Sequence, residues 1–140
     1  MLDASVAVTA NLNLVNEARA SLLRSGASVT IAQIAAATGR SEAAVRGWAA
    51  RERDAGRLVL VPLHDGMQVV PTVQLDEGAA LDEAVADRTR RLVEWGMGPW
   101  ASWHWWEAPN GWLDAFRSPA DAIRAGDLSA VDRALDGLIQ

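Results

Sequence analysis

The sequence predicts a mainly α-helical protein, with an N-terminal winged helix-turn-helix that includes a short β-hairpin, followed by a small C-terminal all-helical bundle. Three observations predict this fold. Residues 30–57 have the pattern of two short helices joined by a glycine turn, and two β-branched runs around an Asp-Gly pair follow them. Caps and glycines then divide the rest into short helices. We place the boundary between a DNA-binding domain, residues 1–75, and an interaction domain, residues 76–140.

The helix pair is bounded by residues that start and stop helices. Thr30 and Gln33 form a predicted capping box, and Gly39 tolerates the left-handed turn that ends the first helix. Ser41 caps the second helix. Ile34, Val45 and Trp48 are then expected to face inward, with the small Ala35 where the two helices approach each other closely.

Elements on either side complete the predicted winged domain. Apolar residues recur at helical spacing over residues 12–23, which predicts a supporting helix packed on the pair, whereas residues 1–10 have no clear pattern and are expected to form a loose arm. Leu58 to Val61 and Gln68 to Val73 flank the turn His64-Asp65-Gly66-Met67, which is a strong hairpin signal. We expect this hairpin to pack behind the second helix as a wing.

The second helix is the predicted DNA-reading element. By helical spacing, its outer face would enter a major groove, while arginines at its end contact phosphates. Arg40 follows the turn glycine, where this pattern usually has an apolar residue, and we include it in the interface. The predicted DNA-binding residues are Arg40, Ser41, Glu42, Arg46, Ala50, Arg51, Arg53 and Arg57.

Composition and charge limit the alternatives. The net charge is −5, but residues 1–60 have a net charge of +2 and residues 61–140 one of −7, so DNA contact is assigned to the first half. No signal peptide or membrane span is apparent and cysteine is absent, so we expect a cytoplasmic protein without membrane contact. We predict no cofactor, metal or catalytic residues. His64 has no partner ligand at metal-binding spacing, and Ser102 and His104, two apart on a helix, face different ways.

The second half is rich in tryptophan. Helices are predicted over residues 81–95, from Pro99 to Glu107, over residues 112–116, after the Ser118 cap, and from Leu128 to Ile139 after the Asp127 cap. Five tryptophans lie within thirteen residues, which is too dense for scattered surface positions. We expect most of them in the core and at least one at an edge or interface. They are Trp100, Trp103, Trp105, Trp106 and Trp112.

The order of these motifs resembles that of a known family. The succession Trp105-Trp106, Pro109-Asn110, Trp112-Leu113, Ser118-Pro119-Ala120-Asp121, Gly126-Asp127 and Val131 is similar to the C-terminal toxin-binding domain of the Xre/MbcA/ParS antitoxins. The joint from Val70-Pro71 to Gln74-Leu75-Asp76 after a helix-turn-helix also resembles actinobacterial members. Relatives often have a glycine pair after the Trp-Leu, where this chain has Asp114-Ala115-Phe116. The resemblance covers residues 30–138.

This resemblance implies a type II antitoxin. Its N-terminal domain would bind its own promoter, and its C-terminal domain would cover a RES-domain toxin that degrades NAD. Caps and turns also explain three of the implied residues, Pro119, Asp121 and Asp127, without any partner. By position, the toxin-binding residues would be Trp105, Trp106, Pro109, Asn110, Trp112, Leu113, Pro119, Asp121 and Asp127.

The resulting hypothesis is a homodimeric antitoxin that neutralises a RES-domain toxin and represses its own operon by binding operator DNA. One alternative is a stand-alone helix-turn-helix transcriptional regulator whose C-terminal bundle mediates dimerisation or ligand sensing. A second is a protein-interaction module with a degenerate helix-turn-helix. An enzyme is the class that the sequence favours least.

Overall fold

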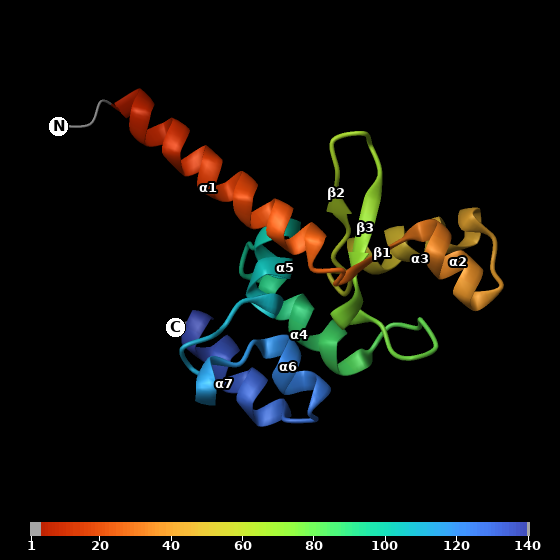
Figure 1. The fold of residues 1–140 in the computed structure, drawn as a ribbon. Helices are drawn as coiled ribbons and strands as arrows, with labels where there is room; N and C mark the ends of the chain where they lie inside the picture. Colours follow the sequence, from red (N-terminus) through yellow and green to blue (C-terminus); the bar gives the residue numbers. More distant parts are fainter. Residues whose placement is uncertain (1–3, 140) are drawn as a thin grey trace.

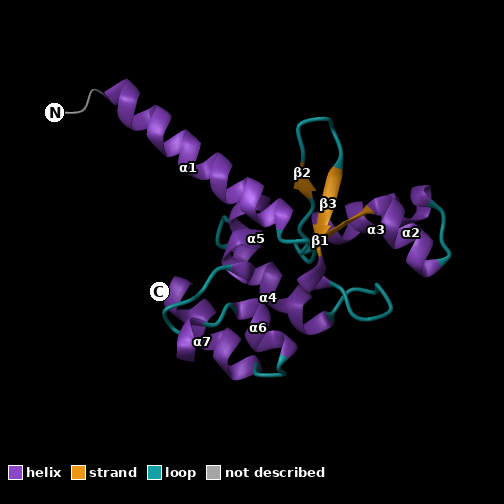
Figure 2. Ribbon diagram, viewed as in Figure 1, coloured by secondary structure: helices purple, strands orange, loops and turns teal. Residues whose placement is uncertain are grey.

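The chain folds into a mainly helical structure with one small antiparallel sheet, as the sequence predicts (Figures 1 and 2). The computed structural model describes residues 4–139, with side-chain surroundings from residue 14 onward. Within this part of the chain, no helix combines the length and hydrophobicity needed to cross a lipid bilayer. The first half contains α1 (Ala4–Arg24), β1 (Ser28–Thr30), α2 (Ile31–Thr38), α3 (Glu42–Asp54), β2 (Val61–Pro62), β3 (Gln68–Pro71) and the 3-10 helix η1 (Thr72–Gln74). The second contains α4 (Glu83–Glu94), α5 (Pro99–Glu107), the 3-10 helix η2 (Asp114–Phe116), α6 (Pro119–Arg124) and α7 (Leu128–Ile139).

The first helix is longer than predicted and packs elsewhere. Residues 4–10, expected in a loose arm, belong to α1, and residues 1–3 of that expected arm lie outside the described part. Figure 1 shows α1 projecting away from the other elements, with its C-terminal end beside the sheet. There Leu22 packs with Val61, Val69 and Trp103. The prediction that this helix supports α2 and α3 is wrong, because β1 follows it directly and ties its end to the sheet.

The sheet contains the predicted hairpin and one strand that the sequence did not reveal. β3 is central, with β2 pairing antiparallel on one side and β1 on the other. The turn after β2 has Gly66 at φ +81°, and the Asp65 carboxylate accepts a hydrogen bond from the Met67 N–H at 3.1 Å. β1 is three residues long, so its sequence has no detectable alternation. The central strand therefore has partners on both sides.

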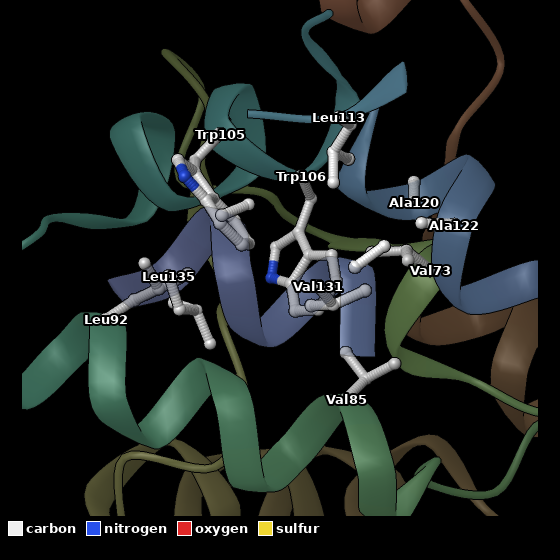
Figure 3. Close-up of a cluster of buried hydrophobic side chains, with 12 residues drawn as sticks. Val73, Val85, Leu92, Trp105, Trp106, Leu113, Ala120, Ala122, Val131 and Leu135 are labelled. Atoms are coloured by element: carbon white, nitrogen blue, oxygen red, sulfur yellow. The ribbon is translucent and has the colours of Figure 1, made fainter. Parts of the chain in front are cut away.

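Three clusters of buried side chains hold the elements together. One lies between α2, α3 and the sheet, and a second fills the C-terminal bundle around Trp106, Val131 and Leu135 (Figure 3). The third brings Trp103 of α5 against Leu22 of α1 and the sheet. The packing of Trp103 therefore crosses the predicted boundary between residues 1–75 and 76–140.

The polar side chain of Gln74 fixes the passage from the sheet to the bundle. It is 1% exposed, and its Oε1 accepts a hydrogen bond from the Val59 N–H at 2.6 Å. Its Nε2 donates to the Val59 carbonyl at 3.1 Å. The Gln74 amide thus takes the place of a neighbouring strand for Val59. A buried amide is tolerated at this position because its donor and acceptor are both used.

We predict that Gln74→Leu lowers the free energy of unfolding by roughly 1–3 kcal/mol, because it leaves the buried N–H and carbonyl of Val59 without partners. Urea denaturation measures this loss. Gln68→Leu, at the half-buried start of β3, is the matched control and should cost much less. Equal losses in the two variants would contradict the bridging role of Gln74.

Candidate nucleic-acid interface

The helix-turn-helix is formed as its capping residues predict. The Thr30 side chain accepts from the Gln33 N–H at 3.1 Å, and the Gln33 side chain accepts from the Thr30 N–H at 2.9 Å. Gly39 has φ +67° and ψ +19°, and its N–H donates to the Ala35 carbonyl. The Ser41 hydroxyl then accepts from the Ala44 N–H at 3.1 Å. These contacts fix where α2 ends and α3 begins, and hence the angle between them.

The inner face of the pair is apolar and closed by the wing. Ile34, Val45 and Ala49 are buried, in one cluster with Leu58 and other residues of the wing. The predicted close approach is present at Ala35, which is also buried. This packing leaves the opposite face of α3 exposed.

The arginine after the turn glycine has a defined place. The guanidinium of Arg40 lies over the ring of the half-buried Trp48, with its central carbon 5.9 Å from the ring centroid. A cation–π contact at an exposed site contributes about 0.5–1 kcal/mol. Arg40 therefore occupies the usual apolar position by covering Trp48, while its charge remains at the surface.

The outward face of α3 carries most of the predicted DNA-reading residues. Ser41, Glu42 and Arg46 are exposed, and Ala50 is half-buried on the same side. Arg46 and Glu42 are 3.5 Å apart in an exposed i,i+4 ion pair, which is weak enough to open for another partner. Arg51 is exposed one turn further along. The structure therefore leaves three arginines accessible: Arg40 in the turn before α3, and Arg46 and Arg51 on α3 itself.

The last two predicted arginines have protein partners. Arg53 contacts Asp54 at 3.3 Å in an exposed pair. Arg57 is 25% exposed and lies 2.9 Å from Glu52 and 2.6 Å from Glu83 of α4. Hydrogen bonds to Glu83 and then Glu52 raise the pKa of Arg57 above its ordinary value. Arg57 thus joins the end of α3 to the second half, which leaves it less available to phosphate than sequence spacing suggested.

The wing contributes little positive charge. Its tip, His64 to Met67, is exposed and contains the acidic Asp65. Pro62 lies in β2, at an edge of the sheet. The arginines predicted to contact DNA therefore lie on α3, in the turn before it and just after its end, not in the wing. Among residues 14–139, no group of three or more His, Asp or Glu side chains is arranged to hold a metal ion.

Most residues that the family resemblance assigns to toxin contact have structural roles here. Trp105, Trp106, Leu113 and Pro119 are buried, and the first three belong to the core shown in Figure 3. Trp105, Trp106 and Leu113 pack in one cluster with residues of α4 and α7. In this fold, these four side chains are buried and do not form an exposed contact surface.

The polar members of that set are caps and turns. The Asn110 side chain accepts from the Trp112 N–H at 2.9 Å, and Asp121 completes a capping box with Ser118. Asp127 caps α7 by accepting from the Ala130 N–H at 3.1 Å and pairs with Arg117 at 2.9 Å. The hydrogen bond from Arg117, and then that from Ala130, lower the pKa of Asp127.

Two exposed aromatic rings mark the surface of the loop between α5 and α6. Trp112 is 58% exposed and lies so close to Gly137 of α7 that a Cβ there would overlap its ring. Phe116 is 74% exposed, and both it and Ala115 have positive φ, 53° and 59°. Such backbone is strained for residues with a side chain. Sequence reasoning missed Phe116, although a lone phenylalanine in a segment rich in turn residues was a usable signal. Pro109 is also exposed in this loop.

Comparison with known proteins shows the fold alone. No protein-family model matches the sequence, and no curated protein matches it. A similar solved structure is the NMR structure of Rv2175c, with a TM-score of 0.64, 20% identity and coverage of 81% of each chain. The similarity therefore extends through most of both halves.

The cap at Asp127 predicts an acid-sensitive contribution to stability. Because its pKa is lowered in the folded protein, the contribution is fully present above the ordinary value of 3.8 and is lost as the pH falls through the folded value. We expect the stability difference between wild type and Asp127→Asn to shrink on acidification, measured by thermal unfolding from neutral pH to about pH 2.5. Asparagine still caps a helix, so a pH-independent difference would contradict the role of the charge.

Glu107 of α5 should show the opposite pH response. Burial raises its pKa above 4.5, and Arg124 only partly opposes this effect. The ionised carboxylate therefore destabilises the fold, and stability falls as the pH rises between the ordinary and the raised value. At neutral pH, we expect Glu107→Gln to be more stable than wild type. This advantage should shrink as the pH falls, in the same thermal unfolding series. If Glu107→Gln were instead less stable than wild type at neutral pH, as we expect of Asp127→Asn, this assignment would be contradicted.

Proposed function

We propose that this protein is a DNA-binding transcriptional repressor that reads its operator with α3. The observation that carries this proposal is the exposed face of a capped, wing-supported second helix, on which Arg46 and Arg51 remain accessible. A helix in this position enters the major groove in helix-turn-helix proteins, and arginine donates two hydrogen bonds to guanine there. Arg46 reads bases in this proposal, and Arg40 and Arg51 contact phosphates.

The uneven charge distribution also supports DNA contact at this helix. Residues 61–140 have a net charge of −7 and would repel phosphate, whereas residues 1–60 have a net charge of +2. A single α3 presents few base contacts, so two copies on a palindromic operator would supply the specificity. We therefore propose that the protein acts as a homodimer.

We further propose that the bundle binds a toxin of the RES-domain class, which makes the repressor an antitoxin of its own operon. The supporting observation is the exposed pair Trp112 and Phe116 on a strained loop, since partly exposed aromatic residues often anchor protein contacts. In this proposal the partner touches this loop, while the buried Trp105, Trp106, Leu113 and Pro119 shape it from beneath. A regulator without a toxin is the alternative.

Arg46→Ala and Arg51→Ala should weaken DNA binding in different ways. Loss of Arg46 should cost about 1–3 kcal/mol and relax preference at one base pair, whereas loss of Arg51 should weaken binding to all sequences and reduce the salt slope by about one. Fluorescence anisotropy, with the DNA upstream of its own coding sequence and a shuffled duplex, measures both. Arg133→Ala on the exposed surface of α7 is the charge-matched control. Unchanged slopes and affinities in both variants would reject the interface.

Phe116→Ser should separate partner binding from folding. Because this side chain is largely exposed, the variant should unfold at the same temperature as wild type and bind DNA normally. It should no longer recover a RES-domain protein on gentle purification from the native host, nor protect cells from that protein. Leu128→Ser, at another exposed apolar position, is the control. If wild type recovers no protein partner, the regulator without a toxin is the better description.

A further inference from the structure

A groove of about 410 Å³ lies between α1 and α5. Leu22 anchors the end of α1 beside Trp103, and from there α1 projects away from the bundle toward its N-terminus (Figure 1). The apolar lining of the groove comes from α1, from α5 and from the segment before α5: Val15, Ala18, Met97, Trp100 and Trp105. Val15 and Ala18 are exposed, so the α1 side of this groove is open to solvent.

The apolar side of α1 continues beyond the groove. Leu14 is 64% exposed and Val15 is 46% exposed. Both lie on the same side of the helix as Ala18, because residues three and four apart are neighbours on a helix surface. Most helices in proteins are stabilised by packing of an apolar face, and a projecting helix of this length is marginal in water by itself. The exposed side of α1 therefore has the character of a packing surface.

The charge of α1 limits what can pack on it. Residues 4–18 contain a single charged residue, Glu17. The groove itself has Arg19 and His104 as polar members, and the Arg19 guanidinium lies over the Trp100 ring, 5.0 Å from its centroid. DNA would need several cations here, and a strongly charged protein would need opposite charges. The occupant that matches this surface is an uncharged helix, and α1 of a second copy is such a helix.

The position of the groove along α1 makes the surface self-complementary. Leu14 is the central residue of α1, which runs from Ala4 to Arg24. In an antiparallel pair centred on Leu14, the N-terminal half of each helix lies along the C-terminal half of the other, where the groove is. The positive end of each helix dipole then lies beside the negative end of the other. One surface used twice about a two-fold axis forms a closed dimer.

The size of this surface suits a stable dimer. A standard protein interface has roughly 20–30 residues a side. The 21-residue α1 and the α5 side of the groove together approach that size in each copy. Figure 1 shows α2 and α3 on the other side of the sheet from the projecting part of α1. Pairing through α1 therefore leaves α3 of both copies accessible.

We propose that a second copy of this chain fills the groove, through an antiparallel pair of α1 helices that cross at Leu14. The N-terminal half of each α1 packs on Val15 and Ala18 of the other copy and on its α5. This inference rests on the homodimer proposed above and assigns a surface to it. DNA binding is not required for the pair to form.

The first test is the mass of the full-length protein in solution without DNA, measured by analytical ultracentrifugation. We expect wild type at twice the chain mass of 15.0 kDa. Leu14→Asp should be a monomer, because it places two carboxylates against each other at the two-fold axis. Leu23→Asp, at another exposed apolar position of α1 far from this axis, is the matched control and should remain a dimer. A monomeric wild type, or a dimeric Leu14→Asp, would overturn the interface.

Cross-linking tests the antiparallel arrangement. The chain has no cysteine, so single cysteines can be introduced without competing thiols. Leu14→Cys should form a disulfide-linked dimer on mild oxidation, because its two copies meet at the axis. In Leu23→Cys the two thiols are about 27 Å apart along the helices, which exceeds the reach of a disulfide. Disulfide dimers in both variants would indicate a parallel pair or random collision, and none in either would indicate a different occupant. Both results contradict the proposal.

DNA binding by the same variants separates this inference from the repressor proposal. Leu14→Asp should retain binding of one α3 to the DNA upstream of its own coding sequence, with at least tenfold lower affinity than the dimer, measured by fluorescence anisotropy. A dimeric wild type that binds no DNA would reject the repressor and leave this interface standing. Specific DNA binding by a monomeric wild type would reject the interface and leave the DNA-reading helix standing.

Discussion

The pair of hydrogen bonds between the Gln74 side chain and the backbone of Val59 fixes the end of the first half, from which the chain passes to the helical bundle. Val59 lies in the segment that carries the chain from α3 to the wing, and Gln74 ends the turn that carries it from the wing to the bundle. The Gln74 carbonyl also accepts from the Asp82 N–H at 2.8 Å, just where α4 is capped. One buried residue therefore positions α3, the sheet and α4 relative to one another.

Two further contacts join the first half to the second. Arg57 at the end of α3 bonds to Glu83 of α4, and Trp103 of α5 packs on the sheet beside Leu22 of α1. Burying a tryptophan removes a large apolar surface from water, so the contribution of Trp103 to cohesion exceeds that of the partly exposed ion pair.

The two proposed binding surfaces differ in how they are built. The DNA-reading face of α3 consists of exposed polar residues supported by a fully buried opposite face, so its geometry follows from the packing beneath it. The aromatic loop instead depends on local constraints: the Asn110 side chain bonds to the Trp112 N–H, and Gly137 leaves room for the Trp112 ring. Mutations in the core would disturb the first surface, whereas mutations in turn residues would disturb the second.

The sequence by itself determined the elements whose signals are local. The caps at Thr30, Ser41 and Ser118, the glycine turn and the Asp-Gly hairpin all appear where they were predicted, because each rests on hydrogen bonds within a few residues. Only the tertiary structure decided where α1 packs, that β1 pairs with β3 and that Arg57 turns toward Glu83. It also decided which tryptophans fill the core and that Phe116 is exposed. These outcomes depend on residues far apart in the chain, and periodicity gives the face of a helix without identifying its partner.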